Sequence, residues 1–232
     1  MAPSFLRQTL LIAGKDLRIE GRSREVLYTM GFSAALVVLV FSFSFANATD
    51  AAQGPLTAAG VLWASTLLTG TVALARVLDR ERENETIRAL LLSPISRGAI
   101  YLGKLIATAT LMFTVELLLV VLAGGLFSAN VFAHLPYLLA VLALGTLGFS
   151  AAGVVFSAAL LRSKSREALL GALLFPIVIP VLLAASRATA CLFDPLSPDL
   201  NPAKFWTLFL VTTDVIYILA GLWMFEPVVA GD

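Results

Sequence analysis

Six long apolar runs, separated by shorter polar segments, set the fold class of this chain. A helix needs about 20 apolar residues to cross the hydrocarbon core of a bilayer. Backbone polar groups in lipid must bond within their own segment, which favours helices over single strands. With 59% hydrophobic and 13% charged residues, the chain has too little polar surface for a soluble domain. We expect an all-α integral membrane protein with six transmembrane helices, at 28–46, 56–75, 105–127, 135–161, 168–186 and 205–225.

Lys and Arg are distributed unevenly between the two sets of alternate connecting segments. Residues 1–27, 76–104 and 162–167 together hold 14 of them, whereas the other connecting segments hold only Arg187 and Lys204. Basic residues accumulate on the cytoplasmic side of membrane proteins. This asymmetry predicts a cytoplasmic N-terminus and a cytoplasmic 76–104 segment, and six spans return the C-terminus to the cytoplasm. The net charge of +1 points to no nucleic-acid partner.

Residues 1–27 carry two stripes at helical spacing, one apolar and one basic. The apolar stripe is Leu6, Leu10, Ala13 and Leu17, and the basic stripe is Arg7, Lys15, Arg18 and Arg22. Such a segment is typical of an amphipathic helix that lies in the membrane interface, with cations toward lipid phosphates. The alternative is a charged lead-in that only sets the orientation of the first span. We expect residues 1–27 to form an interfacial helix and residues 28–232 the transmembrane domain.

The 76–104 connector concentrates charges of both signs, and its length exceeds what joins two neighbouring spans. Oppositely charged residues three apart predict a helix that continues from the second span. Pro94 stops that helix, and Ser96 can cap a new short helix that leads into the third span. The connector is therefore either a docking surface for a cytoplasmic partner or a loop whose charges only keep it solvated. Its length favours docking.

The end of this connector, 98-GAIYLGK-104, matches the first part of a phosphate-binding loop. Such a loop needs a preceding strand and a following Ser or Thr that holds magnesium. Here Leu105 follows, and the flanking segments are helical or membrane-spanning. The match is thus a coincidence, and the chain offers no other nucleotide site. We expect a chain that is not an enzyme, with ATP hydrolysed by a partner.

Two acidic residues, Glu116 and Asp214, lie near the middle of the third and sixth spans. A charged side chain at this depth costs at least about 2.5–3.5 kcal/mol, so such residues face the bundle interior and mark function or partner contacts. The equally weighted alternative is a protonated acid that hydrogen-bonds a hydroxyl group on a neighbouring helix.

Span four contains the small-residue pairs Gly148/Ala152 and Gly153/Ser157. Small residues four apart let two helices approach closely. The pairs mark either a dimer contact or tight packing within one subunit, and we favour the latter.

Several ordered segments resemble the type-2 ABC exporter permeases, and within them the haem exporter protein B family of the cytochrome c maturation system. They are 15-KDLRIEGR-22, 60-GVLWASTLLTGTVALAR-76, 87-IRALLLSPISRGAIYLGK-104, 145-GTLGFSAAGVVFSAALL-161, 173-LLFPIVIPVLL-183 and 214-DVIYILAGLWMFE-226. The similarity extends over nearly the whole chain.

This resemblance implies a subunit of the bacterial inner membrane that works with two copies of a cytoplasmic ABC ATPase, a second copy of itself and a haem-handling membrane protein. It implies that the connector is the coupling element, which rests on the ATPase and passes ATP-driven motion to the spans. The residues assigned to this coupling role are Arg76, Arg80, Glu83, Ile87, Leu91 and Pro94.

Haem ligation by this chain is not expected. Axial ligands come from His, Met, Cys or Tyr in a pocket, and the single histidine, His134, lies in a short loop. There is no C-x-x-C-H attachment motif. We expect no cofactor or metal on this chain, ATP-Mg on the partner ATPase, and haem on a partner.

The sequence is compatible with three functions. The chain is a permease subunit for haem export, a mechanical coupling subunit that drives a neighbouring haem-handling protein without transport, or an exporter permease for another substrate. An intramembrane enzyme is disfavoured, because no base lies beside a nucleophile.

Overall fold

The computed structural model describes residues 4–45, 54–76, 95–127, 129–161, 163, 165–194 and 200–230. Every regular element among these residues is an α-helix, which confirms the predicted all-α fold. Six of the helices are long and apolar enough to cross a membrane. The helices are α1 (Phe5–Ser23), α2 (Glu25–Phe45), α3 (Gly54–Arg76), α6 (Arg97–Leu126), α7 (Leu135–Ala159), α8 (Arg166–Phe193) and α9 (Asn201–Ala230).

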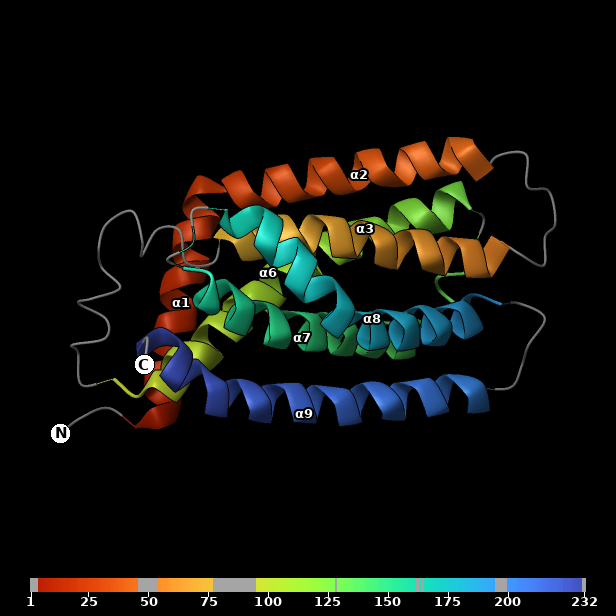
Figure 1. The fold of residues 1–232 in the computed structure, drawn as a ribbon. Coiled ribbons are helices and arrows are strands. Elements are labelled where there is room, and N and C mark those ends of the chain that lie inside the picture. The colour runs from red at the N-terminus through yellow and green to blue at the C-terminus, as the bar shows by residue number, and fades with distance from the viewer. Residues whose placement is uncertain are drawn as a thin grey trace.

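The six long helices run alternately in opposite directions along a common axis, and α1 lies across one end of the bundle (Figure 1). We call this end the α1 end. There α2, α6 and α8 begin, and α3, α7 and α9 end. The described residues on either side of the connector, Arg76 and Ile95, therefore both lie at the α1 end.

Helix α6 begins at Arg97, well before the expected start of the third span at residue 105. The Ser96 hydroxyl accepts a hydrogen bond from the Ala99 amide at 3.3 Å, so Ser96 is the predicted N-cap. The expectation of a separate short helix was wrong, because no proline or other break interrupts residues 97–126. The cap starts one continuous helix that includes the end of the connector and the whole span.

The small residues of α7 pack within the chain, as predicted. A side chain at Gly153 would collide with Leu74 of α3, and the Ser157 hydroxyl donates a 2.7 Å hydrogen bond to the Leu74 carbonyl. Gly145 lies directly under the ring of Trp63, whose indole N–H donates to the Thr189 hydroxyl of α8 at 3.0 Å. Helix α7 thus serves as the close-packed centre of the bundle.

Helix α8 contains Pro176 and Pro180, yet it continues through both and changes direction (Figure 1). Proline removes a backbone donor and kinks a helix in this way. The Tyr217 hydroxyl of α9 donates to the Ile177 carbonyl at the bend, at 2.5 Å. The bend in α8 is therefore hydrogen-bonded to α9.

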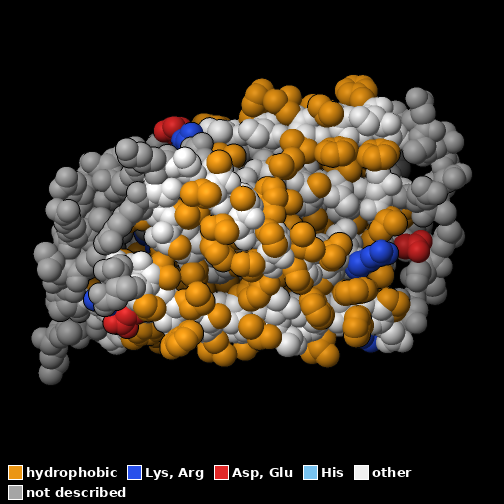
Figure 2. All heavy atoms as spheres, viewed as in Figure 1, with side chains coloured by type: hydrophobic (Ala, Val, Ile, Leu, Met, Phe, Trp, Pro, Cys, Tyr) orange, Lys and Arg blue, Asp and Glu red, His pale blue; other side chains and the backbone are white. Residues whose placement is uncertain are grey.

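Hydrophobic side chains cover the visible outer surface of the spans, and charged side chains are confined to the two ends (Figure 2). Phe43 and Trp223, for example, are 79% and 81% exposed. In water such a surface would be unfavourable, whereas lipid tails cover it without cost. The surface agrees with a multi-pass membrane protein.

Candidate coupling end and buried acids

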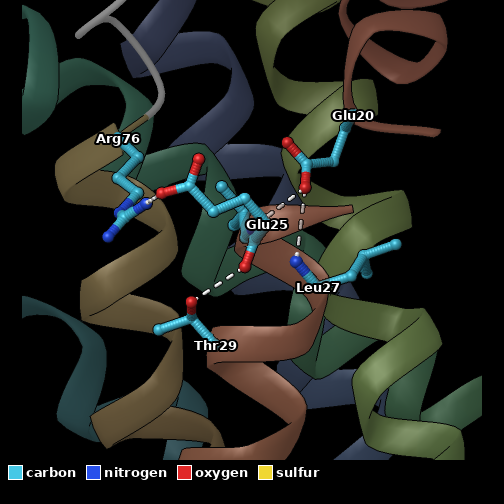
Figure 3. A network of polar contacts seen from close by, with 6 residues as sticks. Glu20, Glu25, Leu27, Thr29 and Arg76 are labelled. Carbon is cyan, nitrogen blue, oxygen red and sulfur yellow. Dashed lines mark hydrogen bonds and ion pairs between the residues drawn. The ribbon is translucent and has the colours of Figure 1, made fainter. Parts of the chain in front are cut away.

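Most residues assigned to ATPase coupling fall outside the described part of the chain. They are Arg80, Glu83, Ile87, Leu91 and Pro94. The sixth, Arg76, is the last residue of α3, and its guanidinium forms a 2.7 Å ion pair with Glu25 Oε1 at the start of α2 (Figure 3). The entrance to the connector is thereby linked to the first span.

A sharp elbow joins α1 to α2 beside this ion pair. Arg24 connects the helices in the left-handed conformation, with φ of 54°. The buried Glu20 carboxylate accepts hydrogen bonds from the Val26 and Leu27 amides at 2.8 and 3.3 Å (Figure 3). A carboxylate at a helix N-terminus satisfies free amides and interacts favourably with the helix dipole. Glu20 therefore holds α1 at a defined angle to the first span.

The exit from the connector is bound to α1. Gln8 Oε1 accepts a 3.1 Å hydrogen bond from the Ser96 amide. Lys104, whose side chain is only 3% exposed, forms a 2.9 Å ion pair with Asp16 Oδ2. An added methyl group at Gly103 would come within 2.7 Å of Ile12.

These contacts show that the residues of 98–104 that match a phosphate-binding loop have structural roles instead. The segment is helical, Gly103 permits the close crossing of α1, and the Lys104 ammonium is occupied by Asp16. Local spacing gives no indication of this pair, because its partners lie far apart in sequence. In the sequence, the two residues are linked only by belonging to segments that resemble the haem exporter family.

The first turns of α6 also contact α9 and α7. Arg97 forms a 2.9 Å ion pair with Glu226. The Tyr101 ring packs on Phe225 with 5.6 Å between centroids, and its hydroxyl donates to the Ala151 carbonyl of α7 at 3.1 Å. The end of the connector is thus joined to three other helices at once.

Glu116 is 1% exposed and lies inside the bundle. Its Oε2 accepts a 2.5 Å hydrogen bond from the Thr146 hydroxyl of α7. Its Oε1 and the buried Thr66 hydroxyl of α3 have no hydrogen-bond partner among the described residues. The hydroxyl contact expected from the sequence is therefore present on one carboxyl oxygen only.

Asp214 is 2% exposed, and neither of its carboxyl oxygens has a hydrogen-bond partner within the described chain. The carboxyl occupies the space that a side chain at Gly148 would fill. Because Thr146 and Gly148 lie two residues apart, Glu116 and Asp214 flank the same turn of α7 on different sides. The sequence placed both acids near mid-membrane but did not indicate that α7 separates them.

Among the described residues, no group of three or more His, Cys, Asp or Glu side chains is arranged to hold a metal ion. His134 stands at the N-cap position of α7 without a side-chain capping bond.

Comparison with known proteins identifies one family. The family model described as CcmB protein matches residues 7–219, a range that begins within α1, includes the first five spans and the connector, and ends within α9. No curated protein matches the chain in sequence. The chain therefore belongs to the CcmB family, whose members are membrane subunits of the haem exporter ABC system for cytochrome c maturation and work with an ABC ATPase partner.

Proposed function

We propose that this subunit couples ATP hydrolysis by a cytoplasmic ABC ATPase to movement of its membrane helices, and that this movement serves haem delivery to the periplasm. In this proposal the 76–104 connector is the docking element, with Arg80 and Glu83 on its contact surface. Two copies of the chain assemble with two ATPase copies in the bacterial inner membrane, beside a haem-handling membrane protein. ATP-Mg belongs to the ATPase and haem to the neighbouring protein.

The observation that carries this proposal is the attachment of both connector ends to other helices. Arg76 pairs with Glu25 of α2. The first turns of α6 are bonded to α1 through Lys104, to α7 through Tyr101 and to α9 through Arg97. Packed helices transmit a displacement because close-packed interiors compress little. A push on the connector would therefore move several helices together.

The distribution of basic residues supports a cytoplasmic position for the connector. Helix α1 and the described ends of the connector lie together at the α1 end (Figure 1), whereas Arg187 and Lys204 lie near the opposite end. The positive-inside rule assigns the basic end to the cytoplasm. In this orientation residues 1–27 lie along the cytoplasmic interface, and residues 28–232 form the membrane domain.

A second candidate is mechanical coupling without transport through this subunit. A polar pathway between two copies needs polar side chains on a surface that the second copy can reach. Glu116 and Asp214, the acids of the third and sixth spans, are 1% and 2% exposed within one chain. Their burial supports a subunit that moves a haem-handling neighbour over one that conducts a substrate between its copies.

Charge reversal tests the docking role. The double substitution Arg80→Glu/Glu83→Arg preserves net charge but exchanges the signs on the predicted contact surface. We expect the amount of ATPase that co-purifies with the tagged subunit to fall at least about tenfold, since mispaired charges at an interface cost several kcal/mol. ATP hydrolysis per purified subunit should fall in parallel.

The matched control is Arg187→Glu/Asp194→Arg, which exchanges two charges at the opposite end of the bundle. This control should recover as much ATPase as the unmodified chain. Unchanged recovery with Arg80→Glu/Glu83→Arg would exclude that surface as the docking site.

A further inference from the structure

Both acids of α1 are directed inward. Asp16 pairs with the buried Lys104 and with Lys15, and its side chain is 17% exposed. Glu20 is 5% exposed and caps the start of α2. The outer surface of α1 is consequently more basic than its sequence suggests, because its carboxylates are used for internal contacts.

The arginines of α1 have the opposite arrangement. Arg7, Arg18 and Arg22 are exposed and form no ion pair or hydrogen bond with any other described residue. At about 100° per residue, the three lie within about 60° of one another around the helix. They share one side of the helix with Lys15 at its edge, and the exposed Leu11 lies between Arg7 and Arg18 on the same side.

An apolar stripe runs beside these arginines. Leu6 and Leu10 are 71% and 64% exposed, and they lie about 60–100° around the helix from Arg7. Ala13, which the sequence placed on this stripe, is instead buried at 3% exposure. The third face of α1, with Ile12 and Asp16, packs on α6.

We propose that α1 is a binding surface for acidic phospholipids, in which Arg7, Arg18 and Arg22 contact headgroup phosphates while Leu6 and Leu10 enter the acyl layer. An acidic phospholipid offers an anion and a hydrocarbon chain side by side, so it fits both the arginines and the leucines. A free phosphate would leave the leucines in water. The inference rests on the interfacial position of α1 given under the proposed function.

The consequence for the subunit follows from the contacts of α1. Asp16 and Gln8 bind the start of α6, while the elbow at Glu20 fixes α1 to the first span. Lipid headgroups that bind α1 would limit its movement, and with it the movement of the start of α6, where the connector ends. Acidic lipid should therefore support the coupling movement as well as the position of the subunit.

Spin-labelled lipids test this binding directly. The full-length chain is reconstituted in phosphatidylcholine vesicles with a trace of spin-labelled phosphatidylglycerol or phosphatidylcholine, and electron paramagnetic resonance gives the protein-bound fraction of each. We expect the unmodified chain to prefer phosphatidylglycerol. An arginine near an acidic surface favours association about fivefold, so Arg7→Gln/Arg18→Gln should remove most of this preference. High salt should weaken the preference in the unmodified chain.

Two matched variants complete the experiment. Arg187→Gln/Lys204→Gln removes the same charge at the other end of the bundle and should keep the preference. Arg7→Lys/Arg18→Lys keeps the charge of α1, so this variant should also keep the preference for phosphatidylglycerol. Thermal unfolding of each variant checks that the fold is intact, and if Arg7→Gln/Arg18→Gln does not fold, Arg22→Gln takes its place.

The proposal is overturned if the unmodified chain shows no preference, if the glutamine variant of α1 retains it, or if both charge-removing variants lose it equally. It is also overturned if Arg7→Gln/Arg18→Gln keeps the lipid preference but loses ATPase recovery, since these arginines would then bind the ATPase. The vesicles contain no ATPase, so failure of connector docking leaves the lipid result unaffected.

Discussion

Gly148 is needed because Asp214 occupies its side-chain space. A Cβ atom at this position would collide with Asp214 Oδ1 and lie 3.2 Å from Val181 Cγ1. The sequence identified Gly148 only as a member of a small-residue pair. The structure shows that its partner is a buried acid on α9 rather than another apolar surface.

Gly148→Ala should therefore destabilise the bundle. Overpacking of a close-packed interior costs about 1–3 kcal/mol, and a buried carboxyl must move in this case. Thermal unfolding of the purified chain in detergent should show a lower midpoint. Combination with Asp214→Ala should recover part of the loss, because the two substitutions act on one contact.

Gly60→Ala is the control for this substitution. Nothing in the described chain lies within 4 Å of a Cβ at Gly60 of α3, and alanine is favoured over glycine in a helix by about 1 kcal/mol. Its unfolding midpoint should stay the same or rise. A Gly148→Ala midpoint as high as that of Gly60→Ala would contradict the assigned contact.

At the scale of elements, the elbow between α1 and α2 depends on one residue in an unfavourable conformation and one capping side chain. Arg24 is the only described non-glycine residue with positive φ, and this conformation costs about 1–2 kcal/mol in an L-residue. The Glu20 carboxylate offsets this cost by bonding two free amides of α2. The angle between α1 and α2 is therefore set by a local backbone arrangement.

Glu20→Ala should loosen this elbow. Loss of a helix cap costs about 1–2 kcal/mol, which corresponds to roughly tenfold faster opening of the capped turn. Hydrogen exchange of the Val26 and Leu27 amides should accelerate by about that factor. In Glu20→Gln, which keeps an oxygen acceptor, these amides should exchange faster than in the unmodified chain and more slowly than in Glu20→Ala.

Glu25→Ala serves as the reference for the elbow. The Glu25 carboxylate pairs with Arg76 at the surface and does not bond the capped amides. Its removal should leave exchange at Val26 and Leu27 nearly unchanged. Equal acceleration in both alanine variants would show that the carboxylate of Glu20 is not the cap.

At the scale of the whole molecule, the two ends of the bundle differ in charge, and this difference predicts how the subunit lies in the membrane. The α1 end carries the basic residues of α1, and the opposite end carries Arg187 and Lys204. The cytoplasmic leaflet holds basic segments through its acidic lipids. If this assignment is incorrect, all six spans have the opposite orientation and the α1 end faces away from the cytoplasm.

Cysteine labelling tests the orientation. In a Cys191→Ser background, a membrane-impermeant maleimide should label Asn130→Cys in intact cells, because Asn130 is exposed at the end opposite α1. Glu83→Cys in the connector should react only after the membrane is permeabilised. Labelling of Glu83→Cys in intact cells would place the connector outside and remove the basis for ATPase docking.

The apolar runs and the basic asymmetry were enough to predict six helices, the position of each span and the end on which charge gathers. These properties depend on local composition, since about 20 apolar residues suffice for a crossing and backbone bonding in lipid imposes the helix. A helix before the first span was predictable for the same reason, because its pattern lies within 19 consecutive residues. The burial of Ala13, which the sequence placed on the apolar stripe, required the folded bundle.

The pairing of residues far apart in the chain required the folded bundle. Asp16 meets Lys104, Asp214 fills the space beside Gly148, and Ser157 bonds the Leu74 carbonyl. Helix periodicity shows which side of a helix is apolar but not which helix faces it. These contacts depend on how α1, α3, α7 and α9 cross, and crossing geometry arises from the packing of whole helices rather than from any local stretch of residues.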